Sequence, residues 1–239
     1  MSKITVDACF SPYLYPVYRD DENIVVIIDI LRATSAICTA FENGVEKIIP
    51  VATVEEARDY QSRGYIAAAE REAVPVEGFP FGNSPYSYMG DHVKGQTIVL
   101  TTTNGTQAIN AAKDAHKVII GAFTNISAVC DYLKSQERNV LLLCSGWKNK
   151  FNLEDALFAG AVTEELSKVE HVKLQDAALA LKYLYQQAKE DPHKFLHNAS
   201  HKERLARLGL KDDIKYCLQS DLTREIPVLE NGALVRLKW

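Results

Sequence analysis

A buried strand that runs into a polar turn and a helix start is the feature that most constrains this chain. Residues 97–112 read TIVLTTTNGTQAINAA, in which an apolar run leads into three threonines, Asn104, Gly105 and Thr106. A helix start presents unpaired N–H groups and the positive end of the helix dipole, so hydroxyls and a glycine there favour an anion pocket. An ordinary strand-to-helix turn with a threonine cap explains the same residues. This segment alone leaves both interpretations open.

The same pattern occurs earlier, in residues 25–40, which read VVIIDILRATSAICTA. Aligning the two apolar runs places Thr34 on Thr106 and Arg32 on Asn104. A second strand and a second helix follow in both segments. We therefore predict an internal duplication of a strand–helix unit.

Length and composition limit the classes of protein to which this chain can belong. The 239 residues, 47% of them hydrophobic and 24% charged, predict a globular chain with a sizeable core. We expect one domain over residues 1–239, with a possible soft lobe boundary near residue 170. The net charge of −4 provides no basic field, so neither nucleic acid nor a membrane is an expected partner. No apolar run has signal-peptide or membrane-spanning length, and five widely spaced cysteines fit reduced thiols, so we expect a cytoplasmic protein.

Short β-rich runs alternate with helical patterns along most of the chain. This alternation predicts a layered α/β/α fold with a mixed sheet, in which ligands bind where strand ends meet helix starts. Residues 171–219 read as mostly helical. The predicted strands are 25–28, 47–51, 65–69, 97–101, 117–121, 139–144 and 233–237; the predicted helices are 34–42, 106–114 and 153–168, with others starting at 53 and near 127.

The first predicted strand ends in Asp29, which is followed by Arg32, Thr34 and Ser35. A lone carboxylate next to a buried strand is costly, which favours a functional role. The arginine could bind a phosphate or carboxylate with both arms of its guanidinium group, and the hydroxyls could add donors. The structural alternative is an internal Asp–Arg pair that caps the helix.

Two later strand ends carry weaker candidates. Glu70 and Arg71 follow the third strand, before a turn that contains Asn83 and Ser84; a surface ion pair and a β-turn explain both motifs equally well. The strand 140–143 leads through Ser145 and Gly146 to two adjacent acids at a helix start, Glu154 and Asp155. Those acids could complement the helix dipole or supply oxygen ligands to Mg²⁺. Asn125 is a further polar candidate.

Three histidines, His193, His197 and His201, recur at four-residue spacing in a charged helical region. Such spacing could bind a metal. No accompanying glutamate of the HExxH type is present, so a solvated helix face is the favoured interpretation.

Taken together, the motifs resemble the 2-phosphosulfolactate phosphatase (ComB-like) family. They recur in order over roughly residues 20–165, with weaker agreement beyond. One departure is Ala69, where the family usually has glycine before its Glu-Arg pair, so we expect that loop to approach the ligand differently. The matching stretches are IDILRATS (28–35), AFENG (40–44), PVATVEEA (50–57), AERE (69–72), GFPFGNSP (78–85), LTTTNGTQAI (100–109) and CSGWKNKFNLEDALFAGA (144–161).

The resemblance implies an Mg²⁺-dependent phosphatase that converts 2-phosphosulfolactate to sulfolactate and phosphate, a coenzyme M step in some organisms. A related phosphorylated hydroxy acid is an alternative substrate. In this reaction the catalytic residues would be Asp29, Arg32, Glu70 and Arg71, with Asp29 or Glu70 as the base. The metal would be held by Asp29, Glu154 and Asp155. The substrate-binding residues would be Thr34, Ser35, Asn83, Ser84, Thr102, Thr103, Asn104, Gly105, Thr106, Ser145 and Gly146.

Three other interpretations rank lower. Asp29 could be a covalent nucleophile, but haloacid-dehalogenase phosphatases use Asp-x-Asp and Leu31 stands at the partner position. A non-catalytic anion-binding sensor does not need four acids near its pocket. A kinase ranks last because the sequence has no GxxxxGK[ST] loop. A homodimer is a possible assembly.

Overall fold

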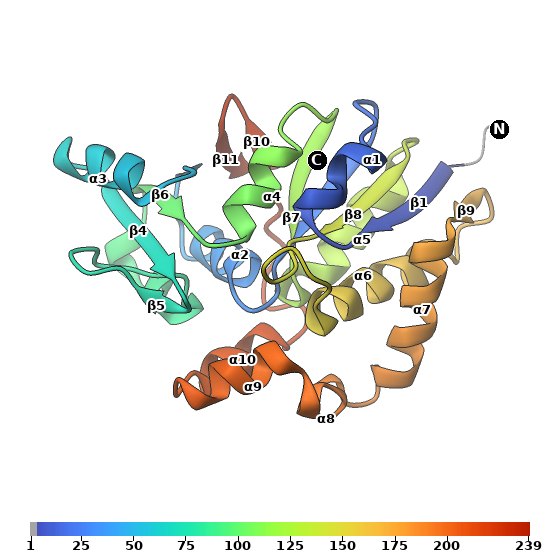
Figure 1. Cartoon of the computed structure of the whole chain (residues 1–239). Helices are drawn as coiled ribbons and strands as arrows, with labels where there is room; N and C mark the ends of the chain where they lie inside the picture. Colours follow the sequence, from blue (N-terminus) through green and yellow to red (C-terminus); the bar gives the residue numbers. More distant parts are fainter. Residues whose placement is uncertain (1–3) are drawn as a thin grey trace.

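A computed structural model describes residues 4–239 as an α/β protein built on one mixed sheet (Figure 1). The described residues contain eleven strands and ten α-helices. The α/β class predicted from the alternating sequence pattern is confirmed. The order of strands across the sheet is β5-β4-β6-β3-β11-β10-β7-β2-β8-β1-β9.

The strands are short, as the apolar runs predict. The central strand β2 is buried along its whole length between β7 and β8, which explains its run of β-branched residues. The strands are β1 (Ile4–Cys9), β2 (Ile24–Ile28), β3 (Lys47–Pro50), β4 (Ile66–Arg71), β5 (Val74–Pro75), β6 (Thr97–Thr101), β7 (Lys117–Gly121), β8 (Val140–Cys144), β9 (Val172–Leu174), β10 (Pro227–Glu230) and β11 (Ala233–Arg236).

The helices follow the expected pattern and continue into the C-terminal third. Helix α3 begins with the predicted capping box, in which Thr53 Oγ1 accepts the Glu56 N–H and the Glu56 carboxylate accepts the Thr53 N–H. The helices are α1 (Tyr15–Tyr18), α2 (Ala33–Glu42), α3 (Val54–Ser62), α4 (Gly105–Ala111), α5 (Ile126–Ser135), α6 (Leu153–Leu166), α7 (Asp176–Ala188), α8 (Pro192–Phe195), α9 (Ser200–Arg207) and α10 (Lys211–Cys217).

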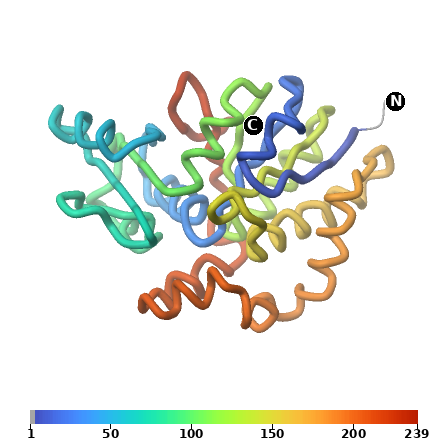
Figure 2. Tube along the Cα trace, in the orientation of Figure 1, coloured from blue at the N-terminus to red at the C-terminus, as the bar shows by residue number. Residues whose placement is uncertain are grey.

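The sheet consists of two parallel blocks joined by a hairpin. Strands β4, β6 and β3 pair in parallel, and so do β7, β2, β8, β1 and β9. The C-terminal hairpin β10–β11 lies between the blocks and pairs antiparallel with β7 and with β3. Figure 2 shows how the chain returns from the C-terminal helices to place this hairpin in the middle of the sheet. The last segment of the chain therefore completes the sheet.

The C-terminal third packs against the earlier elements. Helix α7 lies so close to α6 that a Cβ on Gly160 would be 2.2 Å from the Leu181 carbonyl oxygen. Helices α8, α9 and α10 follow and lie together along one side of the molecule (Figure 1). The lobe boundary near residue 170 stays a prediction, as does the single-domain organisation.

The cysteines and the helix lengths can be compared with what the composition predicted. All five cysteines are buried and unpaired, as reduced thiols would be. Within residues 4–239, no helix combines the length and the apolar character needed to cross a membrane.

Candidate active site

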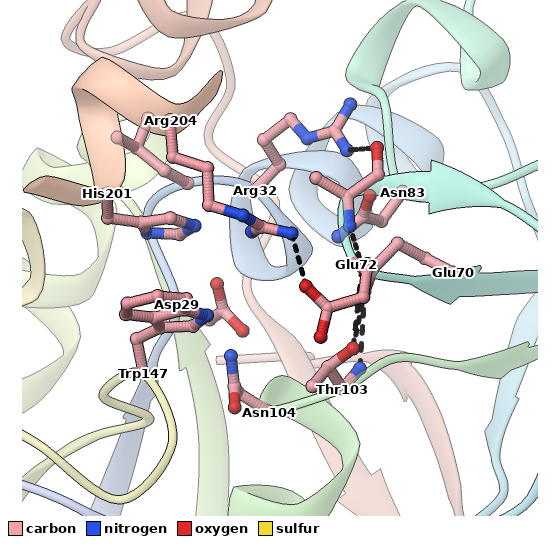
Figure 3. A pocket seen from close by; sticks show the side chains of 12 residues that line it. Asp29, Arg32, Glu70, Glu72, Asn83, Thr103, Asn104, Trp147, His201 and Arg204 are labelled. Carbon is pink, nitrogen blue, oxygen red and sulfur yellow. Dashed lines mark hydrogen bonds and ion pairs between the residues drawn. The ribbon is translucent and has the colours of Figure 1, made fainter. Parts of the chain in front are cut away.

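Segments that follow four different strands converge on one polar pocket, which helix α9 closes (Figure 3). The strands are β2, β4, β6 and β8, so the pocket lies where the sequence pattern predicted ligand binding, at strand ends and helix starts. It is lined by Asp29, Leu31, Arg32, Glu70, Glu72, Ala73, Asn83, Thr103, Asn104, Trp147, His201 and Arg204.

Asp29 lies at the start of helix α2, where the start of helix α4 packs against it. The loop after β2 is fixed because Thr34 Oγ1 accepts the Asp29 N–H at 3.1 Å. A Cβ on Gly105 would lie 3.0 Å from Asp29 Oδ2. Burial raises the pKa of Asp29 to about 6; His201 lowers it, while Glu70 and Glu154 raise it. A carboxyl group with such a pKa can accept or release a proton near neutral pH.

The two strand–helix units predicted as a duplication use their threonines in the same way. Thr106 Oγ1 accepts the Thr102 N–H at 3.3 Å, as Thr34 Oγ1 accepts that of Asp29. Thr106 N–H in turn donates to Thr102 Oγ1. These hydroxyls, and that of Ser35, which donates to the Ile30 carbonyl, shape the turns and do not line the pocket. The duplication itself stays a prediction.

Glu70 connects two walls of the pocket. Its Oε1 accepts the Ala73 N–H at 2.5 Å, and its Oε2 accepts the Thr103 N–H at 3.2 Å (Figure 3). Both carboxylate oxygens are therefore engaged by backbone donors. This arrangement fits a positioning role for Glu70 better than the predicted role as a base.

Arg32 is held by an acid that is distant in sequence. It donates to Asp213 Oδ2 at 2.6 Å and to the Ala73 carbonyl at 2.7 Å. The sequence allowed an internal Asp–Arg pair; the partner is Asp213 of α10 and not the neighbouring Asp29. Arg32 Nε is buried and has no hydrogen-bond partner among residues 4–239, so one N–H of this pocket residue remains available to a ligand.

Two of the predicted substrate contacts line the pocket with free polar groups. Asn104 is the N-cap residue of α4, yet its side chain makes no capping hydrogen bond within the described chain. Asn83 is buried, and its Oδ1 has no hydrogen-bond partner among residues 4–239. A buried polar atom without a partner is costly, so Asn83 is suited to bind a ligand. Asn104 is partly exposed at the pocket and its side chain makes no capping hydrogen bond, so it is also placed to contact one.

Other predicted residues lie outside the pocket lining. Arg71 donates to the Glu70 carbonyl and to Thr101 Oγ1, and therefore braces β4 against β6. Ser84 precedes a short 3-10 helix, and its side chain makes no capping hydrogen bond. Ser145 and Gly146 form the turn after β8, where the Ser145 N–H donates to the Ile28 carbonyl. Asn125, the further candidate, bonds the Ile120 and Glu225 carbonyls in the interior.

His201 is the main site residue that the sequence pattern did not reveal. It is buried, its Nδ1 lies 2.6 Å from Glu154 Oε1, and its ring stacks on Trp147 with an interplanar angle of 6°. The predicted solvated helix face is therefore wrong for His201. The three histidines do not share one helix, because the chain breaks into α8, a 3-10 turn and α9.

The two adjacent acids at the start of α6 differ in their surroundings. Asp155 accepts the Ile30 N–H at 2.8 Å and the Gly146 N–H at 3.3 Å, so it ties the loop after β2 to the turn after β8. Burial and the charges of Asp29 and Glu154 raise its pKa well above the ordinary value. Glu154 Oε2, in contrast, is buried and has no hydrogen-bond partner in the described chain. Within residues 4–239, no three His, Cys, Asp or Glu side chains already form a metal-binding group.

The fold and the pocket together define an α/β protein with a polar, acid-containing site at the junction of several strand ends. The family described as 2-phosphosulpholactate phosphatase matches residues 9–232, and the chain belongs to that family. A protein from Thermotoga maritima is 41% identical over 210 residues, 88% of this chain and 90% of the relative. One from Clostridium perfringens strain SM101 is 39% identical over 227 residues, 91% of this chain and 92% of the relative. Both are named probable 2-phosphosulfolactate phosphatase.

Proposed function

We propose that this protein hydrolyses 2-phosphosulfolactate, with water, to sulfolactate and inorganic phosphate, a reaction of the kind used in coenzyme M biosynthesis. Family membership and the names of the relatives support the reaction class. The observation that carries the proposal is the buried Asp29 between the starts of α2 and α4. Helix starts attract phosphate, and an acid there can act on the bond that breaks.

Neutral and cationic groups around Asp29 fit the charge of a phosphoryl group. The side-chain amide nitrogens of Asn104 and Asn83, both pocket residues, can donate to its oxygens, as can the unpartnered Nε–H of Arg32. Donors fixed before the substrate arrives stabilise charge that develops in the transition state. Asp213 fixes the Arg32 guanidinium group, and Glu70 fixes the backbone of Thr103, the residue before Asn104.

The residues present fit a magnesium ion. Glu154 lies close enough to Asp29 to raise the pKa of Asp29, and Glu154 Oε2 is buried without a partner among the described residues. Mg²⁺ commonly takes one or two carboxylates and completes its shell with water and substrate phosphate. Asp29 and Glu154 would hold it, and Asp155, whose oxygens accept backbone N–H groups, would support them. When bound, the ion would neutralise charge on the phosphoryl oxygens.

In this proposal Asp29 accepts a proton from the attacking water. The P–O bond to sulfolactate breaks, and the leaving oxygen keeps its pair of electrons and takes up a proton, returned by Asp29 or supplied by solvent water. Leu31 lines the pocket where haloacid-dehalogenase phosphatases have their second acid. Rapid quench and mass spectrometry distinguish the two routes. A phosphorylated Asp29 during turnover would show that the carboxylate attacks phosphorus itself.

Phosphate release from small phosphorylated hydroxy acids, with and without Mg²⁺, tests the function directly. We expect Mg²⁺-dependent release from 2-phosphosulfolactate and loss of release in Asp29→Asn. Preferred release from another phosphorylated hydroxy acid would assign a different substrate. Binding without release from any of them would favour the anion-binding sensor.

Thermal unfolding gives a readout of magnesium that does not depend on activity. Mg²⁺ should raise the unfolding temperature of the wild type, because a ligand that binds the folded state stabilises it. Asp29→Asn and Glu154→Gln should each reduce this increase. An equal increase in all three proteins would place the ion elsewhere.

A further inference from the structure

An ion pair joins opposite sides of the pocket. Arg204 of α9 donates through Nη2 to Glu72 Oε2 at 2.6 Å, and both residues line the pocket (Figure 3). Glu72 belongs to the turn after β4, and its side chain is 66% exposed. The Arg204 side chain is 24% exposed. The pair therefore lies where the pocket meets solvent.

Arg204 differs from Arg32, the other arginine of the pocket. Arg32 is buried and held by Asp213 and the Ala73 carbonyl. The partner of Arg204 is a solvent-exposed carboxylate, and exposed ion pairs are worth roughly 0–1 kcal/mol. A ligand anion can thus replace Glu72 at little cost. Lys148, 4.0 Å from Glu72, keeps a cation near the released carboxylate.

The position of the Arg204 guanidinium group does not depend on Glu72 alone. Its central carbon lies 5.5 Å from the centre of the Trp147 ring. Trp147 in turn stacks on His201, which contacts Glu154. Contact with an aromatic face orients a guanidinium group and leaves its N–H groups free.

We propose that Arg204 determines specificity for the sulfonate of the substrate and that Glu72 occupies its N–H groups until the substrate binds. This inference rests on the proposed function. With phosphorus near Asp29 and Asn104, the sulfonate is the acidic group farthest from phosphorus, since the carboxylate is attached to the carbon that carries the phosphate ester. Arg204, at the solvent side of the pocket, is placed for the distant group.

Two substrates that differ only in the sulfonate test the inference. 2-Phospholactate has a methyl group where 2-phosphosulfolactate has a sulfonated methylene. A charge-assisted hydrogen bond is worth about 1.5–3 kcal/mol, so Arg204→Gln should raise KM for 2-phosphosulfolactate about 10- to 100-fold. The kcat for that substrate, and the KM for 2-phospholactate, should change by less than about threefold. Arg204→Lys should fall between wild type and Arg204→Gln, because it keeps the charge and loses the planar pair of donors.

Arg207→Gln is the matched control. Arg207 lies one turn further along α9, is 79% exposed and pairs with Glu203. The Arg207→Gln variant loses the same charge at a position that does not contact the pocket. KM and kcat for both substrates should therefore stay at their wild-type values. Glu72→Gln should lower KM for 2-phosphosulfolactate, because it removes the anion that competes for Arg204.

The outcomes separate this inference from the proposed function. If Arg204→Gln raises KM equally for both substrates, or for neither, the sulfonate role is wrong while the phosphatase proposal stands. If the wild type hydrolyses neither substrate, the proposed hydrolysis of 2-phosphosulfolactate is wrong. In that case, calorimetry of sulfolactate binding to the wild type and to Arg204→Gln tests the role of Arg204. Equal affinities of the two proteins would overturn the role, and weaker binding by the variant would support it.

Discussion

Gly105 packs directly onto Asp29: a Cβ atom at position 105 would lie 3.0 Å from the Asp29 carboxylate and 2.7 Å from the Cβ of Ala33. The starts of helices α4 and α2 therefore meet with no space for a side chain. The glycine in the Asn-Gly-Thr segment is explained by this close approach. The contact brings two separate strand–helix units together around one acid.

Gly105→Ala should therefore reduce both stability and activity. The new methyl group would contact the Ala33 Cβ, which is fixed to the backbone at the start of α2, and the buried Asp29 carboxylate. Overpacking of this kind costs typically about 1–3 kcal/mol. Urea unfolding measures the loss. Gln107→Ala, at an exposed position of the same helix, is the control and should leave both properties unchanged.

Asn104→Ala should lower the rate of phosphate release about 10²- to 10³-fold, as expected for loss of a donor to the transition state. The side chain makes no capping hydrogen bond, so the change should have little effect on stability. Asn110→Ala offers a matched control, because Asn110 is exposed on the same helix. A loss of less than tenfold at position 104 would contradict the anion-pocket interpretation.

Asp213→Ala should destabilise the protein by about 3–5 kcal/mol, because it leaves the buried Arg32 without its partner carboxylate. Activity should fall as well, since Arg32 would lose the contact that fixes it. Asp212→Ala removes the neighbouring acid, whose side chain is 82% exposed, and should have almost no effect. Equal unfolding midpoints for the two variants would show that the pair contributes little.

The pattern of apolar runs was sufficient to predict the class of fold. The seven predicted strands are present because each is a β-rich run between turns. Strand β1 (Ile4–Cys9) was not predicted, although its residues alternate between apolar and polar side chains; it pairs with β8 and β9. Strand β10 was missed as well, because its place in the sheet depends on β7, which is distant in the sequence.

Site residues were predictable where they lie at or close to a strand end, as Asp29, Glu70 and Asn104 do. Local sequence could not show which hydroxyl groups would hydrogen-bond to the backbone of their own turn and not to a ligand. The hydroxyls of Thr34 and Thr106 do so. Local sequence could not show His201 and Arg204 either. These belong to a short helix in the C-terminal third, which reaches the pocket only through tertiary packing.

The raised pKa of Asp29 links the site to stability. The carboxyl group ionises near 3.8 when exposed and at about 6 in the folded protein, mainly because of burial, while the neighbouring Glu70 and Glu154 add to the shift and His201 opposes it. Between these values the folded state binds more protons than the unfolded state. Stability from this group should therefore fall as pH rises from about 4 to 6.

Asp29→Asn should consequently make the protein more stable at neutral pH while it abolishes phosphate release. A shift from 3.8 to about 6 corresponds to roughly 3 kcal/mol at pH 7, and the difference from wild type should vanish below about pH 4. Urea unfolding of both proteins, with a chelator present, measures this difference in the free energy of unfolding. Asp91→Asn, at an exposed position, should show no such gain. If Asp29→Asn is less stable than wild type at pH 7 without magnesium, ionised Asp29 stabilises the fold and its burial is compensated by its neighbours.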